Sequence, residues 1–220
     1  MVFLQESGRG FPFSTDSALL ARFAAPIRAK RIVDFGCGAG VLGVLLHASH
    51  PAAAFCGIEI QPEAAAACRE NFKANGFDSA GIVTGDLREF HTQKFWPAGF
   101  FDLVVSNPPY FAGGRGYTAP DAARAAARDE RNLTLEQLCD AAAYFCRWGG
   151  AFALVHRPER LSEIFCAMTA RGIEPKRLRM AQYRADSAPN LVLIEGRRGG
   201  KPGLRIEPPL VLNSEKEADK

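Results

Sequence analysis

The chain lacks the long apolar segments that define membrane proteins and exported proteins. No stretch of its 220 residues approaches the roughly 18 to 20 uninterrupted apolar residues of a membrane-spanning helix. The N-terminus, MVFLQESGRG, lacks the basic start, apolar middle and small-residue cleavage site of a signal peptide. These absences predict a cytoplasmic protein.

The cysteines lack a metal-binding or redox pattern. No two of them form a C-x-x-C pair, and all lie in apolar or helix-like segments. The six are Cys37, Cys56, Cys68, Cys139, Cys146 and Cys166. We therefore expect buried, reduced thiols, with neither disulfides nor a metal site.

The composition is that of an ordinary globular protein, with 47% hydrophobic and 23% charged residues. Its length suits one large α/β domain better than two small ones. The net charge of +3 is uneven: residues 1–109 hold 9 basic and 10 acidic residues, whereas residues 110–220 hold 18 and 14. This basic second half fits either a polyanionic partner or a solvated arginine-rich surface.

Strand-like and helix-like segments alternate along the chain, which is typical of a parallel, doubly wound α/β sheet. The predicted strands are 31–36, 53–60, 80–86, 101–107 and 151–156, followed by an antiparallel edge pair at 175–184 and 190–198. The predicted helices are 41–49, 62–76, a region around 133–147, and 158–172. The prediction is thus a seven-stranded, mostly parallel sheet.

A glycine-rich turn, VDFGCGAG, follows the first predicted strand. Gly36, Gly38 and Gly40 alternate there, so a ligand can approach the backbone closely. The spacing is G-x-G-x-G, whereas the dinucleotide-binding fingerprint is G-x-G-x-x-G. Asp34 would repel a pyrophosphate but suits a cationic ligand. S-adenosylmethionine (SAM) carries a sulfonium and an ammonium and no phosphate, so the turn favours SAM over NAD.

Acidic residues end the next two predicted strands. Glu59 lies 25 residues after Asp34 and could accept hydrogen bonds from both ribose hydroxyls of the cofactor, or it could be an exposed strand-end acid. Asp86 could accept from the adenine amino group while the backbone N–H of Leu87 donates, although Asp residues at this position also cap helices.

The stretch DLVVSNPPYFAGG ends the fourth predicted strand with two prolines. They could merely terminate the strand, because proline cannot donate to a ladder. They also make the loop stiff, and Asn107 should emerge beside the methyl donor. The Asn107 side-chain oxygen and the Pro108 carbonyl could then accept from the two N–H bonds of a planar amino group, which favours attack by its nitrogen. Tyr110 supplies a stacking face, with Pro109 beside it.

The segments VDFGCGAG, GIEI, GDL and NPPY, in this order, resemble amino-group methyltransferases of the SAM-dependent Rossmann-like class I fold. The GIEI segment adds Ile60 to the cofactor-binding residues that the resemblance implies. NPPY occurs in both adenine-N6 and protein glutamine-N5 methyltransferases, so it defines a planar amino nitrogen as the acceptor.

Three further segments, at 10–23, 153–164 and 190–212, resemble bacterial adenine-N6 methyltransferases that modify valine tRNA next to the anticodon. The resemblance implies SAM-dependent N6-methylation of adenine 37, with the tRNA anticodon stem-loop as partner. It also places Thr15 and Asp16 near the cofactor. Residues 1–30 are then a segment that contributes to the cofactor pocket, 31–213 the methyltransferase domain and 214–220 a charged tail.

Alternatives to this interpretation remain. A protein glutamine-N5 methyltransferase usually has a separate N-terminal helical domain, for which the 30 residues before the first strand are too few. A non-catalytic SAM-binding scaffold would not need the NPPY segment, and DNA or another RNA could be the substrate. Arg115 and Arg128, within 113–132, could grip phosphates around a splayed base or pair with nearby acids on a solvated helix.

Overall fold

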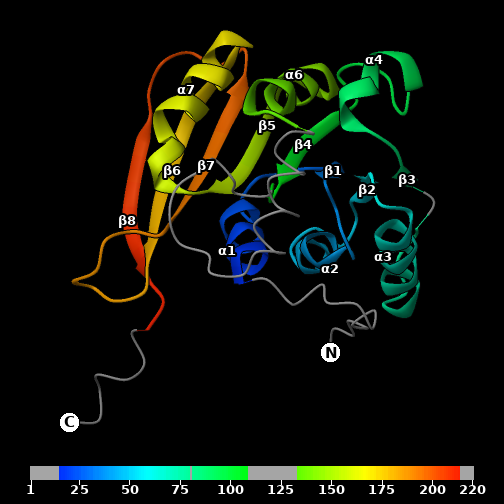
Figure 1. Ribbon diagram of the computed structural model, residues 1–220, viewed down its shortest axis with the longest axis horizontal. Helices are drawn as coiled ribbons and strands as arrows, with labels where there is room; N and C mark the ends of the chain where they lie inside the picture. Colours follow the sequence, from blue (N-terminus) through cyan, green and yellow to red (C-terminus); the bar gives the residue numbers. More distant parts are fainter. Residues whose placement is uncertain (1–14, 80, 109–132, 214–220) are drawn as a thin grey trace, which may run out of the picture.

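A mixed β-sheet forms the centre of the protein (Figure 1). The computed structural model describes residues 15–79, 81–108 and 133–213. Within these residues the sheet has eight strands in the order β3-β2-β1-β4-β5-β7-β6-β8. The strands are β1 Arg31–Phe35, β2 Ala54–Glu59, β3 Ile82–Thr84, β4 Phe101–Ser106, β5 Cys146–His156, β6 Ile173–Gln182, β7 Leu191–Arg198 and β8 Arg205–Val211.

The predicted α/β class is confirmed, and the predicted number of seven strands is corrected to eight. Strands β1 to β5 are parallel, β7 runs antiparallel between β5 and β6, and the additional strand β8 pairs in parallel with β6 at the edge of the sheet. This last strand, RIEPPLV, contains Pro208 and Pro209. Prolines are rare within strands, so the sequence did not predict this one. An edge strand tolerates them because one side of its backbone needs no ladder partner.

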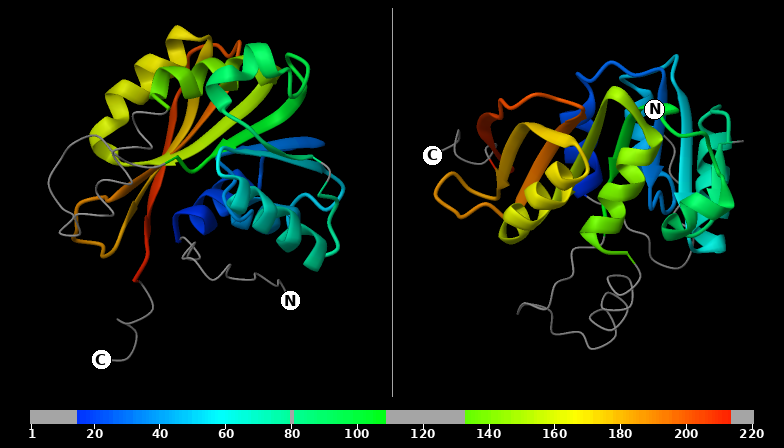
Figure 2. Two further views of the ribbon diagram at one scale, coloured as in Figure 1. Left: turned by 45° about the vertical axis from the view of Figure 1, so that its right-hand side comes forward. Right: turned by 90° about the horizontal axis from the view of Figure 1, so that it is seen from above.

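Helices cover both faces of the sheet (Figures 1 and 2). One face carries α1 Thr15–Ala24, α2 Val41–His47 and α3 Pro62–Ala74. The other carries η1 Leu87–Glu89, α4 Phe90–Gln93, α6 Leu135–Phe145, η2 Pro158–Arg160 and α7 Leu161–Ala170. The sheet is therefore buried on both sides, as its almost continuous apolar strands require.

Local sequence signals explain where several elements begin and end. Helix α3 starts at Pro62, whose missing N–H costs nothing in a first turn, and it is followed by Gly76 with φ of 74°. Helix α6 begins with a capping box, in which the Thr134 side chain accepts from the backbone of Gln137 and the Gln137 side chain accepts from the backbone of Thr134. The predicted helix 158–172 is divided into η2 and α7.

The prediction that all cysteines are buried is wrong for two of the six. Cys56 is half-buried, and Cys166 is exposed on α7. All six are free thiols. Within the described residues, no three His, Cys, Asp or Glu side chains gather closely enough to hold a metal ion. No described helix has the length and apolarity needed to cross a membrane.

Candidate active site

The carboxyl ends of β1, β2 and β4 meet at one edge of the sheet. Strand β1 lies between the other two, and Asp34 pairs in register with Gly57 of β2 and Val105 of β4. Gly36 and Asn107 directly follow their strands and Glu59 ends β2, so all three lie at the same edge. This is the topological switch point where ligands bind in doubly wound sheets.

The glycine loop between β1 and α2 adopts a backbone that requires its glycines. Gly36, Gly38 and Gly40 have φ of 73°, 51° and 85°, a region that L side chains rarely adopt. A Cβ atom added at Gly36 or Gly38 would meet nothing within 4 Å, so the loop leaves open space there. A Cβ at Gly40 would lie 2.6 Å from the Cys68 Sγ. The third glycine thus lets the loop pack closely against α3.

Two side chains hold this loop in place. The buried Glu59 carboxylate accepts hydrogen bonds from the backbone N–H of Gly38 and of Gln61, both at 2.9 Å. From α3, the buried Asn71 Nδ2 donates to the Ala39 carbonyl at 2.9 Å. Each carboxylate oxygen has two acceptor sites, so Glu59 can support the loop and still accept from ligand hydroxyls. No local sequence pattern indicates this role of Asn71.

Asp34 is buried beneath the loop, with 5% of its surface exposed. Burial, and to a smaller extent the nearby Glu59, raise the pKa of its carboxyl from the ordinary 3.8 to about 8. At neutral pH Asp34 is therefore mostly protonated. A cation beside Asp34 would favour its ionised form. The expected attraction between Asp34 and a cationic ligand therefore develops only when the ligand binds.

This burial has a measurable effect on folding. Between the unfolded pKa near 4 and the folded value of about 8, the folded chain keeps a proton that the unfolded chain has released. The free energy of unfolding should therefore fall as pH rises, by up to about 1.4 kcal/mol per pH unit from this group. We expect urea titrations at pH 6, 7 and 8 to show a flatter dependence for Asp34→Asn than for the wild type. Equal slopes would contradict the raised pKa.

Asp86, the third predicted acid, does not lie at the end of a strand. Strand β3 ends at Thr84, so the placement of Asp86 at a strand end is wrong. Its carboxylate instead caps η1 by accepting from the backbone N–H of Arg88 at 2.9 Å, and it also pairs with the Arg88 guanidinium. These Arg88 contacts lower the pKa of Asp86. Leu87 is the first residue of η1 and has a buried side chain, while Ile60 after β2 is 48% exposed. Contacts of Asp86, Leu87 and Ile60 with the cofactor stay predictions.

The N-terminal helix reaches the end of β4. The Asn107 Nδ2 donates to the hydroxyl of Ser17 on α1 at 3.0 Å, and Ser17 is 7% exposed. Thr15 and Asp16 are the first two residues of the same helix. The segment before the first strand is thus in contact with the end of β4, while its contact with the cofactor stays a prediction. Ser17 itself was not predicted.

The other end of α1 is fixed by a buried arginine of β6. The Arg177 guanidinium donates to the Phe23 carbonyl at 2.5 Å and lies 3.8 Å from the centre of the Phe23 ring. The same guanidinium pairs with Glu195 at 2.8 Å. Because its charge is compensated by a carboxylate and a helix carbonyl, Arg177 can be buried, and it ties α1 to the sheet.

Not all predicted site residues can be placed. Pro108 is buried at the end of the described segment. Pro109, Tyr110, Arg115 and Arg128 lie outside the described residues.

The comparison with known families identifies the family of the chain. The Methyltransferase small domain family matches residues 13–160, which include the glycine loop, Glu59 and Asn107. The chain belongs to this family of methyltransferases. Among curated relatives, the tRNA1(Val) (adenine(37)-N6)-methyltransferase of Tolumonas auensis is 32% identical over 82% of this chain and 73% of its own length. A relative with the same name from Porphyromonas gingivalis is 31% identical over 88% of this chain and 77% of its own.

Solved structures agree on the fold. The crystal structure of a predicted O-methyltransferase from Agrobacterium tumefaciens superposes with a TM-score of 0.71, covering 90% of this chain and 87% of its own, at 24% identity. This likeness confirms the predicted Rossmann-like methyltransferase fold.

Proposed function

We propose that this chain is a SAM-dependent enzyme that methylates N6 of adenine 37, next to the anticodon, in valine tRNA. The observation that carries the proposal is the position of Asn107, followed by Pro108, at the end of β4 beside the glycine loop. That arrangement suits a planar amino group as acceptor, and the names of the curated relatives indicate which amino group. The proposed partner is the anticodon stem-loop, and the proposed location is the cytoplasm.

The described residues fit SAM. Gly36 and Gly38 leave open space beside the backbone, Glu59 offers acceptors for ribose hydroxyls, and Asp34 can ionise next to a positive charge. When bound, SAM supplies a methyl group on a sulfonium. In our proposal Thr15 and Asp16 close the pocket from the N-terminal segment, and Asp86, Leu87 and Ile60 contact the adenine side of the cofactor.

Asn107 acts on the acceptor nitrogen. Its Nδ2 donates to Ser17, which orients the amide, and in our proposal its Oδ1 accepts from one N–H of the adenine amino group. The Pro108 carbonyl accepts from the other. Two acceptors in fixed positions stabilise the positive charge that develops on the nitrogen during methyl transfer. Pro109 and Tyr110 form the stacking wall, and Arg115 and Arg128 contact phosphates.

Replacing Ser17 with alanine should lower the turnover number by about three- to tenfold, the effect of losing one hydrogen bond that orients Asn107. The affinity for SAM should change much less. The measurement is a double-mutant cycle with Asn107→Ala, in which Ser17→Ala should have little further effect because both act through one amide. Fully additive losses would show that Ser17 does not act through Asn107.

Methylation with labelled SAM tests the proposed function. The substrates are an unmodified valine tRNA transcript, its anticodon stem-loop, the same transcript with guanine at position 37, and a protein with an exposed glutamine. We expect label in the first two RNAs, as N6-methyladenine, and none in the guanine variant. Label in the protein alone would instead favour the glutamine-N5 activity, and SAM binding without any transfer would favour a scaffold.

A further inference from the structure

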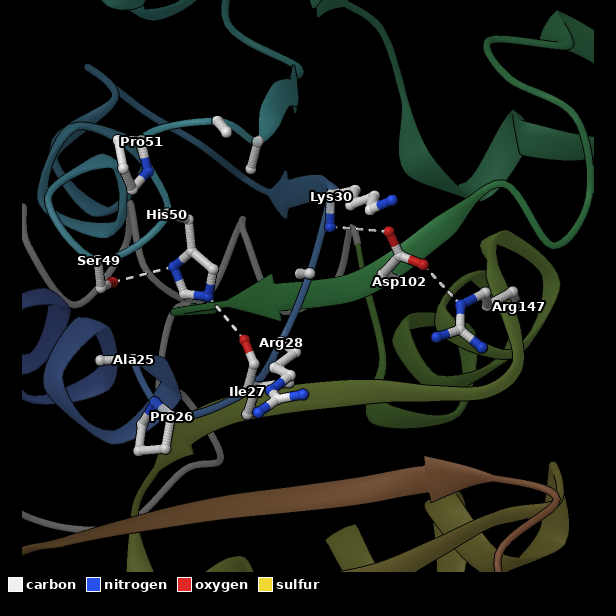
Figure 3. Close-up of a pocket in the computed structure, with 13 residues that line it drawn as sticks. Ala25, Pro26, Ile27, Arg28, Lys30, Ser49, His50, Pro51, Asp102 and Arg147 are labelled. Atoms are coloured by element: carbon white, nitrogen blue, oxygen red, sulfur yellow. Dashed lines mark hydrogen bonds and ion pairs between the residues drawn. The ribbon is translucent and has the colours of Figure 1, made fainter.

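A basic cleft lies at the amino edge of the sheet, opposite the candidate active site. It has a volume of about 460 Å³ and is formed by the segments that enter β1, β2, β4 and β5 (Figure 3). Three of its lining residues are cations, Arg28, Lys30 and Arg147, and its one acidic residue is Asp102. Six residues of β4, at about 3.3 Å each, separate this edge from Asn107 by roughly 20 Å.

The carboxylate in the cleft is already engaged. Asp102 Oδ2 accepts from the backbone N–H of Lys30 and of Arg31, both at 2.9 Å, and Oδ1 accepts from the Arg147 Nε at 2.6 Å (Figure 3). With one charge compensated by Arg147, Asp102 does little to repel an incoming anion. The cleft therefore keeps a net positive charge.

The remaining cations are available for a ligand. Arg28 and Lys30 are exposed, and neither side chain has a hydrogen-bond or ion-pair partner within the described parts of the chain. Arg147 is 46% exposed on its side chain although it is anchored by Asp102. The cleft thus presents two unpaired cations and one oriented guanidinium.

An exposed tryptophan follows Arg147 at the start of β5. Trp148 is 74% exposed, and its ring lies against Gly199, where an added Cβ would come within 2.2 Å of it. Arginines of β7 hold the start of β5: Arg198 donates to the Cys146 carbonyl at 2.5 Å and Arg197 to the Gly149 carbonyl at 3.4 Å. A large aromatic side chain is therefore exposed next to Arg147 in the chain, outside the lining of the cleft.

We propose that Arg28, Lys30, Arg147 and Trp148, the amino-edge surface, bind RNA outside the active site. Cations for phosphates beside an aromatic side chain for an unpaired base are the combination that binds single-stranded or looped RNA. This inference rests on the proposed function, because it assumes an RNA substrate. At roughly 20 Å from Asn107 the surface takes no part in methyl transfer. It captures RNA by charge, which raises affinity and association rate.

Binding of labelled valine tRNA transcript, without SAM, at several salt concentrations tests this surface. The Arg28→Ala/Lys30→Ala double variant should bind about tenfold more weakly and reduce the salt slope by one to two units. Trp148→Ala should lose about fivefold in affinity with little change in slope. Lys30→Ala alone should bind about threefold more weakly. Lys73→Ala, which removes one exposed cation of α3, is its matched control and should change little.

The methylation rate at saturating RNA should be the same in all these variants, whereas the rate at low RNA concentration should fall with affinity. Unchanged RNA affinity in the double variant and in Trp148→Ala, with a wild type that binds and methylates RNA, would overturn the inference alone. A wild type that neither binds nor methylates RNA would overturn the proposed function as well. Equal losses in Lys73→Ala and Lys30→Ala would show a general charge effect and also contradict the amino-edge surface.

Discussion

Replacing Asn107 with alanine should lower the rate of methyl transfer by about a hundredfold or more, the scale of losing one hydrogen bond that forms in the transition state. The variant removes the acceptor that we propose for one N–H of the adenine amino group. It leaves Gly36, Gly38 and Glu59 untouched, so the affinity for SAM should change by much less. Single-turnover kinetics with saturating RNA, together with calorimetric titration of SAM, separate the two quantities.

The Asn107→Asp variant serves as a control for shape. It keeps an acceptor oxygen at the same place but loses the Nδ2 that donates to Ser17. Its rate should therefore lie between those of the alanine variant and the wild type. A rate near that of the wild type in Asn107→Ala would remove Asn107 from the chemistry, although the cofactor site would still stand.

The elements of this fold were predictable where short-range signals agree. The apolar run of β4, the Pro62 start of α3 and the alternating glycines after β1 each determine a local structure from neighbouring residues alone. Strand β8 was not predicted for two reasons. Its hydrogen-bonding partner, β6, lies more than twenty residues earlier, and its two prolines are untypical of a strand. Asp86 was predicted to end a strand, but β3 is only three residues long and ends at Thr84. Asp86 is instead the N-cap of η1.

In the candidate site, too, some features were predictable from the sequence and others were not. Asp34 and Glu59 lie at the carboxyl ends of buried strands and Asn107 directly follows one, so the topology alone brings them to one edge. The contacts that hold them depend on the packed structure: Ser17 and Asn107 are 90 residues apart, and Arg177 and Phe23 are 154 apart. No local pattern marks such pairs. The raised pKa of Asp34 likewise depends on complete burial, which a sequence does not quantify.

Replacing Glu59 with alanine should weaken SAM binding by at least tenfold and by up to several hundredfold. Two losses combine. In the proposed role, charge-assisted hydrogen bonds from Glu59 to the ribose hydroxyls would contribute about 1–3 kcal/mol to binding. The backbone N–H groups of Gly38 and Gln61 also lose their acceptor, so the glycine loop is no longer held in the conformation that leaves space for the ligand. Calorimetric titration measures the affinity, and urea unfolding of the same samples measures what the loop loses in stability.

Two further variants separate these losses. Glu59→Gln keeps the size of the side chain, but its single carbonyl oxygen replaces two carboxylate oxygens, so its affinity for SAM should lie between those of Glu59→Ala and the wild type. Glu63→Ala removes an exposed acid from the first turn of α3, four residues away, and should leave the affinity unchanged. If Glu59→Ala unfolds like the wild type and binds SAM equally well, Glu59 is not a ligand of the cofactor. If it loses stability but not affinity, its part is confined to holding Gly38 and Gln61.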